Sequence, residues 1–144
     1  MAAEQNYDNH RRFFPPFHFV AMPALIINLG VEAARLNKYQ TLYHVWLVVF
    51  ALALIVFALT ARTMALTAQN RVIRLEERLR LATLMPENQR AGINDLTAGQ
   101  LIGLRFASDE EAPELAARCA TGELKGSGDV KRAIRNWRAD HLRV

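Results

Sequence analysis

The sequence is poor in cysteine, histidine and recognisable catalytic motifs. Its single cysteine, Cys119, has no second thiol for an internal disulfide, which fits a reducing compartment. The four histidines show no spacing typical of a zinc or haem site. The stretch GELKGSGD lacks the Lys-Ser/Thr ending of a phosphate-binding loop, and a helix dipole explains the consecutive carboxylates at 109–111. We therefore expect no enzyme, and no catalytic, cofactor-binding or metal-binding residues.

Charge is scarce in the first half of the chain. Residues 13–61 carry three charged side chains, whereas residues 62–144 carry 14 Lys and Arg against 11 Asp and Glu. A single change of solvent preference along a chain is typical of a membrane part followed by an aqueous part. We predict an all-α membrane protein with a transmembrane hairpin in 1–61, an amphipathic cytoplasmic helix in 62–85 and a small helical module in 86–144.

Two uncharged runs are long enough to cross a bilayer. Nineteen residues separate Arg12 from Glu32, and twenty-three separate Lys38 from Arg62. As helices, these runs reach roughly 28 and 34 Å, against about 30 Å for the hydrocarbon core. The predicted spans are 14–34 and 41–61. Pro23 lies inside the first span, and the sequence leaves open whether this helix is straight or kinked.

Basic residues lie mainly on one side of the two spans. Arg11 and Arg12 precede the first span and five arginines lie between residues 62 and 80, while the connecting loop holds Arg35 and Lys38. The positive-inside rule then places both termini in the cytoplasm, at a bacterial inner membrane. The first segment also has features of a cleaved signal peptide, but its length, its prolines and the acidic residues before it favour a span.

The second span is followed by helical sequence with no breaker until Pro86. We predict one helix from about residue 41 to 85, which runs from lipid into water and holds the C-terminal module above the bilayer. Its second half carries an apolar stripe with the 3, 4 spacing of a heptad seam. The stripe consists of Ala65, Ala68, Val72, Leu75, Leu79 and Ala82.

The stripe is the candidate interaction face, with Val72, Leu75, Leu79, Arg71 and Glu76 as its main residues. With residue 65 at heptad position a, Arg71 falls at g and Glu76 at the following e. Three interpretations remain open. The stripe packs against the chain's own C-terminal helices, which we favour; it forms a coiled coil with another chain; or it lies on lipid headgroups. Glu76 and Arg80 are also expected to pair within the helix at i, i+4.

The last sixty residues read as short helices with caps and show no strand pattern. Capping boxes are expected at Thr97–Gln100 and Ser108–Glu111, and Asp129 is expected to cap a helix over VKRAIRNWR. A module this small buries little surface, so we expect it to borrow the Val72/Leu75/Leu79 face or a partner. The predicted core residues are Ile93, Leu96, Leu101, Ile102, Leu104, Phe106, Leu115, Leu124, Ile134 and Trp137.

The basic C-terminal tail is a candidate anion-binding surface. Arg132, Arg135, Arg138 and Trp137 combine cationic side chains with one aromatic ring, which suits anionic lipid or nucleic acid. We favour the alternative, in which Ile134 and Trp137 are buried and the arginines are solvated or paired with carboxylates of 109–114. Nucleic acid is therefore not an expected partner.

Histidines at the membrane boundary offer one further alternative, an accessory subunit that binds haem or quinone through His18 or His44. The predicted spans place these two residues near opposite membrane faces, so interfacial hydrogen bonding is favoured. At the end of the first span, Glu32 and Arg35 are expected to form an ion pair.

Four stretches together resemble a family of small bacterial membrane proteins classed as a domain of unknown function. They are QNYDNHRRFFPPFHF, ARTMALTAQNRVIRLEERLRL, LTAGQLIGLRFASDEEAPELAARC and VKRAIRNWRADHLRV. The resemblance covers nearly the whole chain and implies a bacterial two-span protein with a cytoplasmic helical tail, but no activity. The residues themselves lead us to expect a non-catalytic accessory protein with the lipid bilayer and a protein partner, or a second copy, as its partners.

Overall fold

A computed structural model of the chain describes residues 5–7, 9 and 13–140. The secondary structure in this part of the chain is helical, apart from one isolated β-bridge between Ala107 and Trp137. The chain divides into two compact units. The hairpin unit is Phe13–Leu66, and the helical unit is Thr67–Arg143 together with Met1–Arg12.

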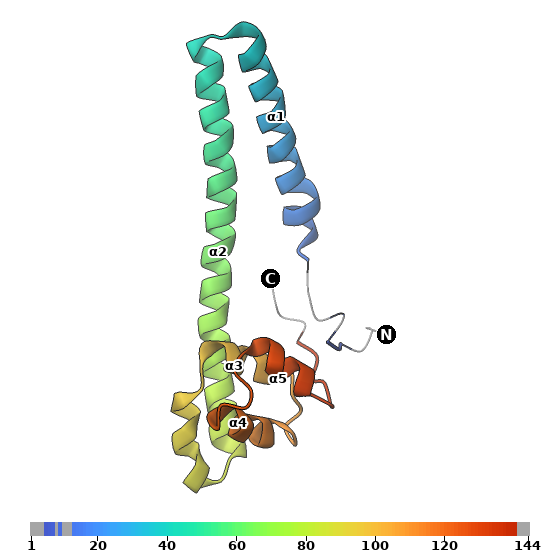
Figure 1. The fold of residues 1–144 in the computed structure, drawn as a ribbon, viewed down its shortest axis with the longest axis vertical. Coiled ribbons are helices and arrows are strands. Elements are labelled where there is room, and N and C mark those ends of the chain that lie inside the picture. Colours follow the sequence, from blue (N-terminus) through green and yellow to red (C-terminus); the bar gives the residue numbers. More distant parts are fainter. Residues whose placement is uncertain (1–4, 8, 10–12, 141–144) are drawn as a thin grey trace. The chain divides into compact units, whose positions relative to one another are not determined.

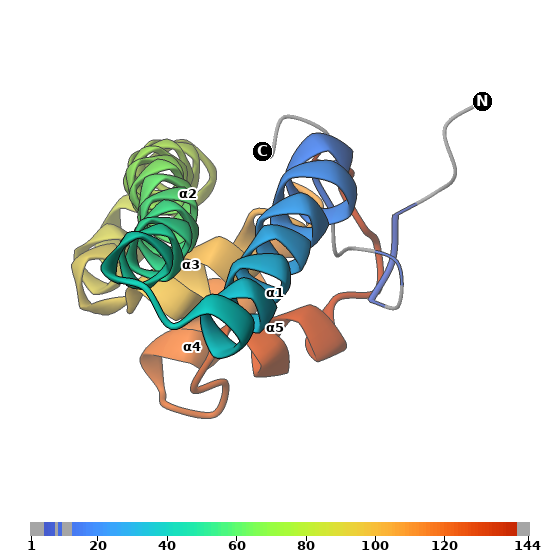
Figure 2. The ribbon, with the colours of Figure 1, turned by 90° about the horizontal axis from the view of Figure 1, so that it is seen from above.

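The hairpin unit contains a π-helical segment, η1 (Pro16–Ala21), then α1 (Met22–Tyr39) and the first part of α2 (Leu42–Leu84). α1 and the first part of α2 run antiparallel and are joined by a short turn (Figure 1, Figure 2). At the turn, Gln40 adopts a left-handed conformation with φ 48° and donates its N–H to Leu36 O at 2.8 Å. This end of α1 lies five residues beyond the predicted end of the first span, because residues 35–39 continue the helix.

Pro23 does not interrupt α1, since it lies in the first turn, where a helix needs no N–H donor. The irregularity lies just before it, where Met22 N–H bonds to Phe17 O, five residues back. Pro23 cannot bond the carbonyl of Phe19, and its ring crowds that group. A widened turn relieves such crowding, which accounts for the π-helix at this point.

The predicted long helix is present, because α2 covers Leu42–Leu84 without a break and ends before Pro86. The helical unit continues with η2, a 3₁₀ helix (Glu87–Asp95), then α3 (Ala98–Leu104), α4 (Ala112–Ala120) and α5 (Ser127–Ala133). α3 packs against α4 and α5, and α4 also packs against η2 and α5. The expected capping box opens α3, with Thr97 and Gln100 as its members.

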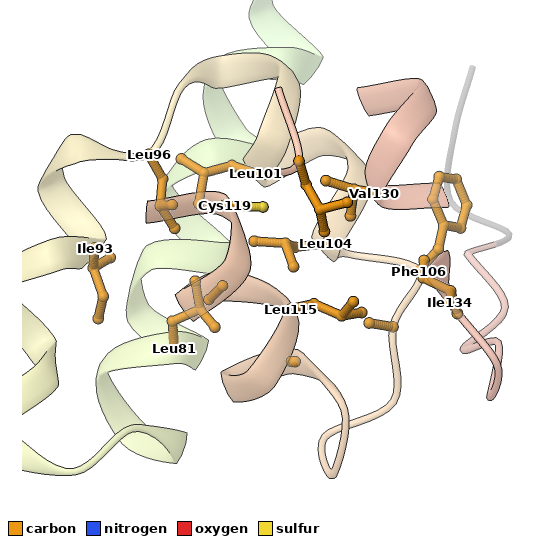
Figure 3. Close-up of a cluster of buried hydrophobic side chains, with 14 of the residues drawn as sticks. Leu81, Ile93, Leu96, Leu101, Leu104, Phe106, Leu115, Cys119, Val130 and Ile134 are labelled. Atoms are coloured by element: carbon orange, nitrogen blue, oxygen red, sulfur yellow. The ribbon is translucent and has the colours of Figure 1, made fainter. Parts of the chain in front are cut away.

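The core of the helical unit joins the end of α2 to the short helices. Leu81 and Leu104 are fully buried, and Figure 3 shows Leu81, Leu104 and Leu115 pointing toward one another. Most predicted core residues are buried there, while Trp137 is partly buried against the cluster and Ile102 is half-buried outside it. The buried ones are Ile93, Leu96, Leu101, Leu104, Phe106, Leu115, Leu124 and Ile134.

The last helix differs from the prediction at both ends. α5 begins after Gly126, and Asp129 is not its N-cap but its third residue, where its carboxylate accepts the N–H of Gly126 at 3.1 Å. The helix stops at Ala133 instead of continuing through residue 138. The following backbone bonds elsewhere: Glu111 Oε2 accepts two N–H groups, from Arg135 and Asn136, at 3.1 Å each. Tertiary hydrogen bonds therefore replace the last turns of the predicted helix.

Candidate functional site: an open helix face beside a charged cavity

The apolar stripe of α2 faces outward in the helical unit. Val72, Leu75 and Leu79 are 54, 61 and 62% exposed. The face that meets the short helices is a different one, centred on Ile73 and Leu81, which are 7 and 0% exposed. The expectation that the module borrows the Val72/Leu75/Leu79 face is therefore wrong. Residues 73, 77, 81 and 85 recur at i, i+4 and form the packing face, which leaves Val72, Leu75 and Leu79 uncovered, while Ala82 at the end of the heptad stripe packs partly against the core.

We call the exposed residues Ala68, Val72, Leu75 and Leu79 the open stripe. Two charged side chains of the candidate face flank it, Arg71 and Glu76, and both are exposed. The expected pair between Glu76 and Arg80 is wrong: Arg80 Nη1 instead donates to Glu77 Oε2 at 3.0 Å. This leaves the Glu76 carboxylate at the surface beside the open stripe.

A cavity of about 600 Å³ lies next to the open stripe, inside the helical unit. α2 provides one wall, and residues 105 and 138–140 provide the rest. Positive and negative side chains are equally represented in the lining. A cavity with such walls holds water or a small polar ligand, or is covered by a partner with matching charges. The lining residues are Gln69, Val72, Ile73, Glu76, Glu77, Arg80, Arg105, Arg138, Ala139 and Asp140.

Glu77 and Arg80 form the most buried charged pair of this cavity. The Glu77 side chain is 4% exposed and that of Arg80 12%. Burial raises the pKa of Glu77 above 4.5, and this effect outweighs the lowering of the pKa by the charge of Arg80. Arg80 also donates to Asp109 Oδ1 and to the carbonyl of Ala107, both at 2.7 Å. The guanidinium thus links α2 to the loop after α3.

Arg105 is a second buried charge that the sequence does not single out. It is 5% exposed, its Nη1 lies 3.2 Å from Asp140 Oδ2, and its Cζ lies 4.4 Å from the centre of the Phe106 ring. Arg105 follows an apolar run in the sequence, and a charged residue at that position is expected to lie in solvent at the end of α3. The contact with Asp140 joins positions 35 residues apart, and neither helical periodicity nor capping signals such a pair.

The candidate anion-binding residues are engaged within the helical unit. Arg132 Nη2 lies 2.6 Å from Asp129 Oδ1, and Arg138 Nη1 lies 3.8 Å from Asp109 Oδ1. The Trp137 ring lies 5.3 Å from that of Phe106, at the edge of the core. The Arg135 side chain is exposed. The four residues therefore belong to a folded edge in which two of the arginines have carboxylate partners.

The histidines of the hairpin unit have separate surroundings. His18 Nδ1 lies 2.9 Å from Phe14 O, among the rings of Phe13 and Phe17. His44 stacks on Tyr39 with ring centres 5.2 Å apart, and its Nδ1 lies 4.0 Å from Glu32 Oε2. The expected ion pair between Glu32 and Arg35 is present at 3.0 Å.

The described residues contain the one cysteine of the chain and several potential metal ligands. No group of three or more His, Cys, Asp or Glu side chains there is placed to hold a metal ion. Cys119 is buried, and desolvation raises the pKa of its thiol to about 11, so it remains protonated at neutral pH. The predicted basic residues Arg11 and Arg12, with His10 and His141, lie outside the described residues.

The comparisons with known proteins yield a family and no activity. No curated protein and no solved structure matches the chain. One family, DUF6526, described as a family of unknown function, matches residues 1–144. The match covers the chain from end to end, so the protein belongs to the DUF6526 family of unknown function.

Proposed function

We propose that the chain is a non-catalytic integral membrane protein that presents its helical unit to a protein partner at the cytoplasmic face of a bacterial inner membrane. The observation that carries this proposal is the exposure of the apolar residues of the hairpin unit. Both helical stretches, Pro16–Tyr39 and Leu42–Leu84, are long and apolar enough to cross a bilayer, and 6% of each apolar window is buried.

The exposed side chains of α2 support a lipid environment over a protein core. Phe50, Phe57 and Leu59 are 51, 71 and 47% exposed, and Leu59 lies on the opposite side of the helix from the two phenylalanines. Complete transfer of such a side chain out of water contributes roughly 1.5–3 kcal/mol. A water-soluble protein buries such side chains in its core, whereas a membrane protein leaves them facing lipid.

The turn and the ends of the hairpin support the orientation. Gln40 and Thr41 form a short uncharged connection, and Arg62 follows the second apolar run, with its Cζ 4.9 Å from the Phe17 ring centre. Guanidinium groups and aromatic rings are typical of a membrane interface. Together with the five arginines between residues 62 and 80, this contact supports our proposal that the Arg62 end of the hairpin, and the helical unit after it, lie on the cytoplasmic side.

The open stripe supports a role in protein interaction. It is an apolar surface in the part of the chain that is polar, and exposed apolar patches of this kind mark contact sites for other proteins. The stripe, the flanking charges and the adjacent cavity together form the surface that we propose for the partner.

Flotation and co-purification test the proposal. Full-length protein expressed in bacteria is expected to float with membranes in a density gradient and to remain with them after alkaline washing, which strips peripheral proteins. A matched variant that carries arginine at Val49, Ala53 and Val56 is expected to lose this behaviour, because three charges in a span are costly. Wild-type protein recovered in the soluble fraction would contradict the membrane assignment.

A further inference from the structure

We propose that the open stripe docks against the same stripe of a second copy of this chain, in parallel, as a short two-stranded coiled coil. In this arrangement Arg71 of one copy pairs with Glu76 of the other, and the symmetric pair forms on the opposite side. The parallel direction rests on the proposed function, because two copies inserted in one membrane with the same topology have parallel α2 helices.

The apolar residues of the stripe match the preferences of a parallel pair. Val72 and Leu79 occupy position a, and Leu75 occupies position d. Val72 with Leu75 fits the rule that a β-branched residue at a with leucine at d favours two parallel strands, whereas Leu79 at the next a position is not β-branched. All three side chains are more than half exposed, so the chain's own short helices leave this seam accessible.

Charge complementarity identifies the occupant as a second copy. In a parallel pair, position g of one helix lies beside position e of the next heptad in its partner, which joins Arg71 to Glu76. In an antiparallel pair, g lies beside g, so Arg71 or Arg78 would meet another arginine. The stripe is therefore complementary to itself in one direction only, as a two-fold symmetric interface requires.

The seam is short, but insertion of both chains into one membrane favours their pairing. Residues 68–79 span fewer than two heptads, which is too little for a stable coiled coil between free peptides in water. Two chains confined to one bilayer meet at a much higher effective concentration than the same chains in solution. A modest apolar contact is then sufficient to hold the pair.

The cavity beside the stripe adds a consequence of pairing. Val72 of the open stripe and Glu76, which flanks the stripe, also line the cavity. A second copy on the stripe brings its Arg71 to the rim formed by Glu76. Pairing thus covers one side of the cavity with a positive charge from the partner.

Disulfide crosslinking of full-length protein in membranes tests this inference. Leu75→Cys, at a central d position, is expected to give a disulfide-linked dimer under mild oxidation. Asn70→Cys is the matched control, because it is exposed on the same helix at position f, away from the seam. Wild type controls for Cys119, which is buried.

Charge variants in the Leu75→Cys background test the register. Arg71→Glu and Glu76→Arg are each expected to lower the crosslinked fraction about fivefold, the combined effect of two exposed ion pairs. The variant that combines Arg71→Glu with Glu76→Arg is expected to restore the crosslinked fraction.

The outcomes separate the two proposals. Equal crosslinking at residues 70 and 75, no crosslinking at either, or adducts of Leu75→Cys with another protein overturns the second-copy inference, provided that the variants still float with membranes. Loss of flotation by the wild-type protein overturns the proposed function instead.

Discussion

Arg80 connects α2 to the loop after α3 in the helical unit. It bonds Glu77 within α2 and reaches Asp109 and the carbonyl of Ala107 after α3. We expect Arg80→Ala to lower the free energy of unfolding by about 3 kcal/mol, because it leaves the Glu77 carboxylate buried without its cation. The measurement is chemical denaturation in mild detergent, followed by tryptophan fluorescence in a Trp46→Phe background, in which Trp137 is the remaining tryptophan. Arg135→Ala is the control, since its side chain is exposed, and it is expected to change stability by less than about 0.5 kcal/mol. Equal losses in the two variants would show that the network around Arg80 is not important.

Glu77 gives the stability of the helical unit a pH dependence of unusual sign. Because burial raises its pKa in the folded state, folded protein holds a proton at pH values where the unfolded chain has released it. Its contribution to stability is therefore complete below about pH 4.5 and is lost as the pH rises through the folded-state pKa. Relative to Glu77→Gln, which carries no titratable group there, the wild type should become less stable as the pH rises from 4.5 to neutrality. Denaturant titrations at several pH values measure this difference, with Glu76→Gln as the exposed control. A wild type that becomes more stable than Glu77→Gln as the pH rises would falsify the raised pKa of Glu77.

At the scale of elements, Gly103 sets how closely α3 approaches α5. A Cβ atom at this position would lie 2.8 Å from Val130 Cβ, which is closer than such atoms can approach, and 3.2 Å from Ser127 O, which is a tight contact. We expect Gly103→Ala to cost about 1–3 kcal/mol of stability, because one helix must move away from the other. Gly128→Ala is the matched control in α5, where no atom lies within 4 Å of the added Cβ. That variant should be neutral or gain up to about 1 kcal/mol from higher helix propensity. Thermal unfolding of the two variants distinguishes them, and a stable Gly103→Ala protein would mean that this helix contact is looser than described.

The elements also show what the sequence can predict. The limits of α2 follow from local signals, since an uninterrupted run of helix formers ends at Pro86, and the box at Thr97 and Gln100 is local as well. The end of α5 depends on Glu111, which lies 24 residues before Arg135 and draws the backbone out of the helix. Distant partners of this kind leave no periodic pattern.

The choice of packing face was mispredicted for a related reason. α2 carries two apolar rows, one at residues 72, 75 and 79 and one at 73, 81 and 85, and the second includes a charged residue, Glu77. A charge in a row normally marks the solvent side of a helix. In this helix Glu77 is buried and paired with Arg80, so the row that contains it faces the core. The row at residues 72, 75 and 79, which the sequence predicts to face the core, is exposed.

At the scale of the whole molecule, the proposed topology places the α1–α2 turn outside the cytoplasm and the helical unit inside it. Single cysteines at Thr41, in the turn, and at Thr121, after α4, report the two sides. Both positions are exposed, and native Cys119 does not interfere because its thiol is buried, with a pKa raised to about 11. In intact spheroplasts, a membrane-impermeant maleimide should label Thr41→Cys but not Thr121→Cys, and lysis should make both reactive. A signal peptide cleaved near residue 33 would leave a single span with its N-terminus outside and its C-terminus in the cytoplasm, so the labelling pattern would be the same. The mature protein would then be shorter by more than thirty residues, which mass spectrometry detects. Labelling of Thr121→Cys before lysis would reverse the orientation, and with it the cytoplasmic placement of the open stripe and the cavity.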